Sequence, residues 1–317
     1  MPDTEYSAPR RTQEYFVAPP DEVEVLAIDR VQDAGSPTSI WRDAWKQLRR
    51  NPIFILSVLL ILFVLLVVAW PQLFTGLDPH YCDTAQSMAP SRSGHPFGFD
   101  RQGCDVFART VYGTRASVAC GIGATVLFVL VGGVLGSLSG FYGGILDVVI
   151  SRVAEIFFAL PLILAGIVIM QLLNSRTIWT VILVLGAFTW PQAARIARGA
   201  VIQAKNSEYV TAAKALGVSP GRILMRHVLP NAAGPLIVVS TIWLGVFIVT
   251  EATLSYLGVG LPQTLVSWGI DIAADQKSIR TSGILFYPAT ALALTVLSFI
   301  MLGDAVRDAL DPKARRR

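Results

Sequence analysis

The sequence predicts an all-α membrane protein with about six transmembrane helices, on the evidence of its composition, its apolar runs and the positions of its basic residues. Of the 317 residues, 53% are apolar and 15% are charged, and the mean hydropathy of +0.55 is higher than a soluble globular domain carries. The net charge of +4 is too small a basic excess, on too apolar a chain, to indicate a nucleic-acid partner. The composition therefore excludes a purely soluble protein.

The first 51 residues divide into a tail and a short amphipathic segment. Residues 1–38 are polar and contain no long apolar run, which is typical of a disordered cytoplasmic tail and not of a cleaved secretory leader. Within residues 39–51, Trp41, Trp45 and Leu48 recur at helical spacing opposite basic side chains. This pattern predicts an amphipathic helix that lies in the membrane interface.

Six apolar segments are long enough to cross a hydrocarbon core, which takes roughly 17 to 25 helical residues. In the second, Gly132, Gly136 and Gly140 repeat every four residues, so a neighbouring helix backbone can approach closely. Pro161 interrupts the third. The six predicted spans are residues 53–70, 117–142, 146–173, 178–196, 234–257 and 284–302.

Lysine and arginine gather in three regions: before the first span, between the fourth and fifth spans, and after the sixth. With six spans, all three regions lie on one side of the membrane, and the positive-inside rule makes that side the cytoplasm. An odd number of spans would scatter the basic clusters to both sides, which disfavours it. Both termini are therefore predicted to be cytoplasmic.

The segment between the fourth and fifth spans predicts two short helices joined by a bend. Gly217 suits the left-handed residue that ends the first helix. Ser219 is suited to cap the second helix, Pro220 fits its first turn, and Pro230 is expected to close it. The sequence thus predicts a cytoplasmic helical hairpin.

Small side chains share one side of the first of these helices. Val210, Ala213 and Gly217 lie together there, with Ala212 and Leu216 beside them. Such a face would let another protein approach closely, which is the functional interpretation. The same spacing also fits a hairpin that folds back on its own bundle, and the pattern leaves both interpretations open.

The hairpin resembles the EAA loop of bacterial ABC-importer permeases, whose pattern is Glu-Ala-Ala, three residues, Gly, nine residues, then Ile-x-Leu-Pro. The residues that occupy this pattern are Thr211, Ala212, Ala213, Gly217, His227, Leu229 and Pro230. The spacing is met in full, although Thr211 replaces the usual acidic residue and His227 the usual isoleucine. The form His-Val-Leu-Pro-Asn is common in the peptide and nickel importers.

Two further segments extend the resemblance over residues 40–310. Residues 95–118 are similar to the His-Pro-Phe-Gly-Thr-Asp segment of the C-type permease of dipeptide and oligopeptide importers. Residues 251–269 are similar to the Glu-x-x-Leu-Ser-Phe-Leu-Gly-Leu-Gly and Trp-Gly segments of the same family. The resemblance implies the type I ABC-importer permease fold, with cytoplasmic EAA coupling helices, in a multi-pass protein of a bacterial cell membrane.

By this resemblance, the chain pairs with a homologous second permease subunit to form the translocation path for di- or oligopeptides. Cytoplasmic ABC ATPase subunits would dock on the EAA loop, and an extracytoplasmic substrate-binding protein would deliver the cargo. The chain contains no Gly-x-x-x-x-Gly-Lys-Ser/Thr phosphate loop, so ATP and Mg would be bound by the partner subunits. The chain would then be no enzyme and have no cofactor of its own. Nickel chelates and glutathione are the alternative cargoes.

The spans and the resemblance together imply the following regions. They are a disordered cytoplasmic tail (1–38), an interfacial helix (39–51), a first transmembrane helix (52–71), an extracytoplasmic segment (72–116), a permease core (117–303) with a coupling loop (199–230), and a basic cytoplasmic tail (304–317).

Two acidic residues stand in apolar sequence. An uncompensated charge at Glu155 or Glu251 would cost at least about 2.5 kcal/mol, so each is expected to face the bundle interior, water or an interface. A proton-coupled secondary transporter would use such carboxylates, and this is the alternative class of protein. Both residues lie toward the ends of their spans, which favours structural roles.

The three cysteines receive different interpretations. Cys82 and Cys104 both fall in the predicted outer segment, 22 positions apart, where an oxidising compartment permits a disulfide. The alternatives are a zinc site that uses His80, Cys82, His95 and Cys104, or two free thiols. Cys120 lies inside the second span and is predicted to be an inert packing residue.

Overall fold

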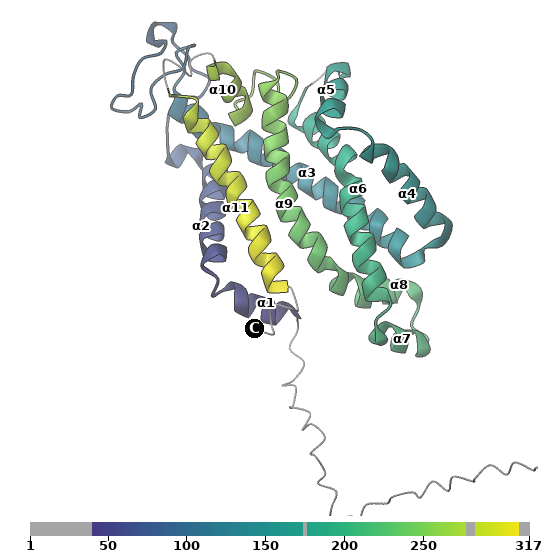
Figure 1. The fold of residues 1–317 in the computed structure, drawn as a ribbon. Helices are drawn as coiled ribbons and strands as arrows, with labels where there is room; N and C mark the ends of the chain where they lie inside the picture. Colours follow the sequence, from purple (N-terminus) through teal and green to yellow (C-terminus); the bar gives the residue numbers. More distant parts are fainter. Residues whose placement is uncertain (1–39, 174–175, 277–282, 311–317) are drawn as a thin grey trace, which may run out of the picture.

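The computed structural model describes residues 40–173, 176–276 and 283–310, which form a bundle of inclined helices (Figure 1). Among these described residues, five helices are long and apolar enough to cross a membrane. They are α2 (Pro52–Ala69), α3 (Val106–Tyr142), α6 (Ile178–Lys205), the continuous helix Pro220–Tyr256, and α11 (Phe286–Leu310). The pair α4 (Gly144–Phe158) and α5 (Leu162–Leu172) adds a sixth span if it is counted as one. The prediction of about six spans is confirmed.

Pro161 breaks the third predicted span, as expected. α4 and α5 meet at 84°, and Pro161 stands in an extended conformation just before α5. A proline ring fixes φ, removes a backbone donor and disfavours helical geometry in the residue before it. Pro191, by contrast, lies inside the unbroken helix α6. The presence of proline alone therefore does not decide where a span breaks.

Four of the described helices are longer than the apolar runs that predicted them. They begin or end at Val106 instead of 117 (α3), Lys205 instead of 196 (α6), Pro220 instead of 234 (the continuous helix Pro220–Tyr256) and Leu310 instead of 302 (α11). Hydropathy marks only the stretch suited to hydrocarbon, about 20 residues, whereas backbone hydrogen bonding continues into polar sequence. The predicted regions 72–116 and 304–317 therefore each contain helical residues.

The start of α3 shows the local cause of its extra length. The Asp105 carboxylate accepts a hydrogen bond from the backbone N–H of Ala108 at 2.6 Å, which satisfies one of the first donors of the helix. The other Asp105 oxygen lies 2.6 Å from Nδ1 of His95. A polar cap thus begins the helix eleven residues before its apolar run.

Helix α1 (Ile40–Leu48) occupies the predicted amphipathic segment and packs on the end of α11. Ala44 and Leu48 are buried against Ala305 and Ala309, while the Trp45 side chain is exposed. On its apolar side, α1 therefore contacts the bundle through Ala44 and Leu48, whereas Trp45 does not pack against the bundle to the same extent. Its interfacial location remains a prediction; the tails 1–38 and 311–317 and the side chain of Trp41 lie outside the described part of the structure.

The glycine stripe of α3 contacts α6, as the spacing predicts. A Cβ atom at Gly132 would meet Ala193 Cβ and Trp190 O, one at Gly136 would meet the backbone of Ala194, and one at Gly140 would stand 2.7 Å from Arg198 O. The two helix backbones thus approach as closely as glycine allows. α3 also packs along α9 (Leu229–Tyr256), which in turn packs on α11.

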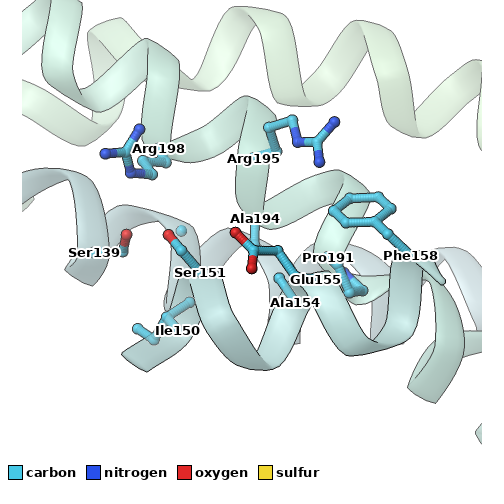
Figure 2. A pocket seen from close by; sticks show the side chains of 11 residues that line it. Ser139, Ile150, Ser151, Ala154, Glu155, Phe158, Pro191, Ala194, Arg195 and Arg198 are labelled. Atoms are coloured by element: carbon cyan, nitrogen blue, oxygen red, sulfur yellow. The ribbon is translucent and has the colours of Figure 1, made fainter. Parts of the chain in front are cut away.

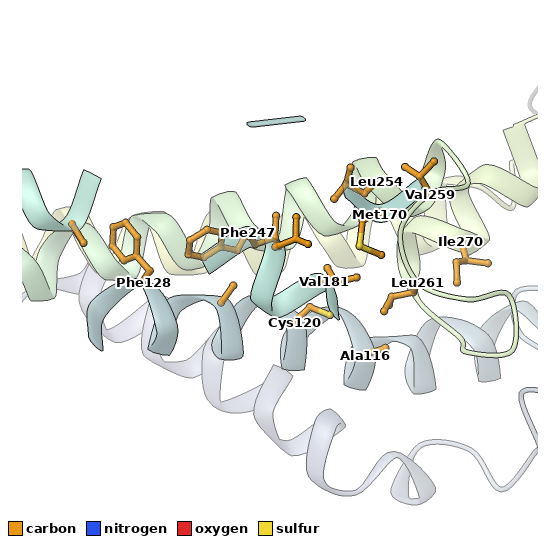
Figure 3. Close-up of a cluster of buried hydrophobic side chains, with 14 residues drawn as sticks. Ala116, Cys120, Phe128, Met170, Val181, Phe247, Leu254, Val259, Leu261 and Ile270 are labelled. Atoms are coloured by element: carbon orange, nitrogen blue, oxygen red, sulfur yellow. The ribbon is translucent and has the colours of Figure 1, made fainter. Parts of the chain in front are cut away.

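The main hydrophobic cluster lies between these helices (Figure 3). Phe128 of α3 packs against Phe247 and Trp243 of α9, with ring centroids 5.8 and 5.3 Å away. Met170 of α5 and Cys120 of α3 are fully buried in the same cluster. Cys120 is thus a packing residue, as predicted.

Cys82 and Cys104 form a disulfide in the segment between α2 and α3, as predicted. The bond joins two strand-like pieces that pair as an isolated antiparallel bridge. Because both sulfur atoms are used by the disulfide, the alternative zinc site with two thiolates is not formed in this structure. The segment lies at the end of the bundle opposite α7 and α8 (Figure 1).

We expect non-reduced digests of the protein, alkylated before digestion, to contain one cross-linked species that joins the Cys82 and Cys104 peptides. In the chain-entropy model, a loop of this length contributes about 3 kcal/mol. Mass spectrometry with and without reductant measures the cross-link, and reduction should release two free peptides as the control. Full alkylation of both thiols without reductant would contradict the disulfide, and alkylation that requires a chelator would favour the zinc alternative.

Candidate functional site

The predicted helical hairpin is present and lies at one end of the bundle (Figure 1). α7 (Glu208–Ala215) is followed by Gly217 at φ +75° and by α8 (Pro220–Ile223). The N–H of Gly217 donates to Lys214 O, and the N–H of Val218 donates to Ala213 O. These bonds close the turn around a left-handed residue, for which glycine has no steric penalty. The predictions for Gly217 and Pro220 are confirmed.

Pro230 does not close the second helix, so this prediction is wrong. α8 continues through a five-residue π-helical turn, η3 (Leu224–Val228), directly into α9. The N–H of Leu229 bonds to Leu224 O, five residues back. Such a widened turn makes room in the helix at the position where a proline ring would otherwise clash with a preceding carbonyl. The second half of the hairpin is therefore continuous with the membrane helix α9.

The small-residue face of α7 packs on its own chain. Val210 and Ala213 are buried in a cluster with Val201 of α6 and with Ile223 and Leu224. The interpretation of this face as the contact surface for another protein is therefore wrong for these two residues. A helix that joins a bundle through a short bend must bury one side, and here the small side chains let it lie close to α6.

The seven residues of the EAA-like pattern fall into two groups. Thr211, Ala212, Gly217 and Pro230 are exposed, whereas Ala213 is buried and His227 and Leu229 are partly buried. Helical spacing places the members of the motif on different sides of α7 and η3. Some of them are therefore exposed on the surface, and the others pack against the chain itself.

Two large apolar side chains of the hairpin are exposed. The sequence placed Leu216 beside the small-residue face, whereas Met225 was missed as a contact residue. Leu216 is 83% exposed and Met225 is 67% exposed. Tyr209 is also exposed, and we refer to these exposed apolar side chains of the hairpin as its apolar tip. Lys214 and Arg222 are exposed near them in the sequence. Large apolar side chains displayed in a polar loop mark an interaction surface. Their position in a basic, water-facing segment was the available signal.

The base of the hairpin is tied to neighbouring helices by polar contacts. Lys205 Nζ donates to Phe141 O at 2.6 Å, at the end of α3. The guanidinium of Arg198 donates from Nε and Nη2 to the two oxygens of Asp147 in α4, at 2.6 and 2.7 Å. A paired guanidinium of this kind fixes orientation as well as distance. These contacts join the hairpin end of α6 to α3 and α4.

Glu155 and Glu251 occupy different environments. Glu251 in α9 is fully buried; its Oε1 accepts from Ser255 Oγ at 2.8 Å, and its Oε2 has no partner among the described residues. Glu155 in α4 is exposed and pairs with Arg152 at 2.8 Å. No hydrogen bond or ion pair of the described residues connects the two carboxylates. They form no continuous proton path in this structure.

A second polar cluster lies at the opposite end of the bundle, around α10 (Trp268–Asp275). Arg109 of α3 donates through Nε to Asp271 at 2.8 Å. Asp271 Oδ2 and Asp275 Oδ1 are buried without a hydrogen-bond partner among the described residues. Burial raises the pKa of Asp271 to about 6, against the opposing effect of Arg109. Burial and the nearby Asp100 and Asp271 raise the pKa of Asp275 to about 7.

These raised pKa values predict that α10 is held less firmly at high pH. Both carboxyls bind protons in the folded protein that the unfolded chain releases near pH 4, so their stabilising contribution falls as pH rises through about 6 to 7. Hydrogen exchange of α10 amides, corrected for intrinsic rates, should be faster at pH 8 than at pH 5.5. Asp275→Asn should reduce this difference. Equal protection at both pH values would contradict the prediction.

The bundle of long apolar helices defines a multi-pass membrane protein. Residues 132–316 match the family described as "Binding-protein-dependent transport system inner membrane component", and residues 39–90 match the "N-terminal TM domain of oligopeptide transport permease C". The chain belongs to the family of binding-protein-dependent transport system inner membrane components, and it has the type I ABC permease fold.

Several relatives are similar over most of their length. The chain is 38% identical over 280 residues to the oligopeptide transport system permease protein OppC of Bacillus subtilis, covering 88% of this chain and 91% of the relative. It is 38% identical over 310 residues to the dipeptide transport system permease protein DppC of the same organism, covering 94% of each. The glutathione transport system permease protein GsiD of Pectobacterium atrosepticum is 32% identical over 277 residues, covering 87% of this chain and 92% of the relative.

Proposed function

We propose that this chain is the C-type membrane subunit of an ATP-driven importer of di- or oligopeptides in a bacterial cell membrane. The observation that carries the proposal is the hairpin, whose EAA-like residues run from α7 through η3 into the first turn of α9 without a break between η3 and α9. The names of the OppC and DppC relatives support a peptide cargo, and the GsiD relative makes glutathione the second candidate. The nickel alternative rests on the form of the hairpin motif alone.

The proposed partners divide the work of transport. A homologous permease subunit would complete the translocation path, an extracytoplasmic binding protein would deliver the cargo, and ATPase subunits would bind ATP and Mg. The apolar tip of Leu216 and Met225 suits insertion into an apolar groove of an ATPase subunit, with Thr211 and Ala212 beside it. The exposed Lys214 and Arg222 suit an acidic rim around that groove.

The geometry of the hairpin suits a lever. α8, η3 and α9 form one continuous helix. A displacement of α8 by a partner would therefore tilt α9 as well, because no loop separates the two. The contact of Lys205 with the end of α3 and the pair of Arg198 with Asp147 would carry the same movement into α3 and α4. Rigid-body tilting of helices around a central path is a known way to alternate access.

The orientation that fits this function puts the hairpin and both termini in the cytoplasm. In Figure 1, α1 and the end of α11 lie at the same end of the bundle as α7 and α8, whereas α10 and the disulfide-bonded segment lie at the other end. This arrangement agrees with an even number of spans, and the positions of the basic residues favour the cytoplasm for the hairpin end.

The energy source tests the proposal against a proton-coupled transporter. We expect peptide uptake by the assembled complex to fall at least about tenfold when ATP is depleted, and to persist when the proton gradient is collapsed while ATP is maintained. Uptake of a labelled dipeptide in cells treated with each agent measures this. Uptake that survives ATP depletion and follows the pH gradient would favour the alternative class. Glu155→Gln and Glu251→Gln would then be the variants to compare.

A further inference from the structure

A cavity of about 200 Å³ lies between α4 and α6 and is also lined by residues of α3 (Figure 2). Ser139 of α3, Ser151, Glu155 and Phe158 of α4, and Arg195 and Arg198 of α6 contribute to its walls. Three charged side chains, Glu155, Arg195 and Arg198, border this space. Arg198 also forms the ion pair with Asp147 at the base of the hairpin, whereas Arg195 takes no part in the contacts described there.

Arg195 is the unusual member of this cavity. Its guanidinium carbon lies 4.0 Å above the centre of the Phe158 ring, and Figure 2 shows the two side chains facing one another. Among the described residues, none accepts a hydrogen bond from this guanidinium. The neighbouring Arg198 differs, because two of its nitrogens donate to Asp147. The Phe158 ring thus holds the Arg195 guanidinium in place. The N–H groups in the plane of the guanidinium remain free to donate hydrogen bonds to a ligand.

The charges around the cavity leave one positive charge in excess. Three arginines, at positions 152, 195 and 198, accompany two carboxylates, Asp147 and Glu155, and each carboxylate is already paired with an arginine other than Arg195. A ligand with a single negative charge would balance the group. Guanidinium groups bind phosphate and carboxylate oxygens in a bidentate manner, and a phosphodiester carries this single charge.

The position of the cavity along α6 indicates that this phosphate belongs to a membrane lipid. α6 has 28 residues and is therefore about 42 Å long, which exceeds a hydrocarbon core of about 30 Å. Arg195 lies ten residues before the hairpin end of α6, about 15 Å from it along the helix axis. This places its guanidinium near the boundary between acyl chains and headgroups on the hairpin side. The exposed apolar side chains of α4, Val149 and Ile156 among them, would contact the acyl chains.

We propose that this cavity binds the phosphate of an acidic phospholipid in the leaflet on the hairpin side. Arg195 donates two hydrogen bonds to the phosphate oxygens, and the Ser151 hydroxyl, whose only described contact is a long one to Asp147 at 3.5 Å, donates a third. The pairing of Glu155 with Arg152 limits the repulsion between carboxylate and phosphate. A lipid bound here contacts both α4 and α6, so it would stabilise one relative position of these helices.

The test is retention of phosphatidylglycerol by the purified full-length chain, measured by native mass spectrometry in detergent. We expect Arg195→Gln to weaken binding about tenfold and Glu155→Gln to strengthen it several-fold, because it removes the repelling charge. Arg307→Gln is the matched control: it makes the same charge change at an exposed site on the same end of the bundle, and it should leave this binding step unchanged. An increase in Glu155→Gln cannot arise from misfolding.

Competition distinguishes the two sources of phosphate. If millimolar inorganic phosphate leaves the lipid bound, the ligand is a lipid headgroup; if it displaces the lipid, the cavity is a site for free phosphate and the lipid assignment is wrong. The proposed site would be wrong if Arg195→Gln and Arg307→Gln weakened lipid binding equally. It would also be wrong if Arg195→Gln did not weaken lipid binding. Loss of the lipid on assembly with the partner subunits would overturn the proposal that this cavity holds a lipid in the importer. None of these outcomes depends on the peptide cargo.

Discussion

Replacing Gly217 with valine is expected to reduce peptide uptake by at least about tenfold while the protein still inserts into the membrane. Gly217 has φ +75°, and a Cβ there would meet no atom within 4 Å, so the cost is backbone strain and not a clash. That strain is on the order of 1 to 3 kcal/mol for a β-branched residue. The chain can relieve it by changing the angle between α7 and α8, which would misplace the apolar tip of the hairpin.

Gly217→Asn is the matched control, because asparagine tolerates the left-handed region better than other non-glycine residues. We expect this variant to keep most of the uptake activity. Uptake of a labelled dipeptide and co-purification with the ATPase subunits are the two measurements, and membrane insertion is checked by fractionation. Normal uptake and normal association in Gly217→Val would show that the bend is not part of the coupling site.

Replacing Gly136 with alanine is expected to destabilise the helix bundle by about 3 kcal/mol or more. The new Cβ would collide with the O, Cα and C atoms of Ala194, which belong to the α6 backbone and cannot rotate away. Overpacking in cores commonly costs 1 to 3 kcal/mol, and a backbone obstacle should place this change at the upper end or beyond. Thermal unfolding of the purified chain, followed by reactivity of the buried Cys120, measures the loss.

Gly199→Ala is the control for that experiment. Gly199 lies in the same pair of helices, on α6, but a Cβ there would meet no atom within 4 Å. Because alanine favours helices over glycine by about 1 kcal/mol, this variant should be as stable as the natural chain or slightly more stable. Equal stability of Gly136→Ala and Gly199→Ala would show that α3 and α6 do not pack as described.

The sequence predicted those features that depend on a residue's own chemistry or on its near neighbours. Helical spans follow from long apolar runs, because unpaired backbone groups are excluded from hydrocarbon whatever lies alongside. Gly217 was identified because a left-handed turn favours glycine, and Pro161 because a proline ring disrupts a helix. The disulfide between Cys82 and Cys104 followed from an expected oxidising compartment and only one pair of cysteines outside the spans.

Features that depend on distant parts of the chain needed the tertiary structure. Pro161 breaks its span, whereas Pro230 is carried through a π turn, and the local sequence around each does not show which outcome packing against neighbouring helices permits. The ends of α3, α6 and α11 extend past their apolar runs because caps and helix contacts stabilise polar turns. Hydropathy carries no information about either effect.

The candidate site divides in the same way. The sequence by itself determined the EAA-like pattern, its spacing and the bend at Gly217, because these are set by order along the chain. Only the tertiary structure decided that Val210 and Ala213 face inward and that Leu216 and Met225 face outward. The side of α7 that is buried depends on where Val201 of α6 lies. Helical periodicity defines the faces of a helix, but only its packing partners determine which face remains free.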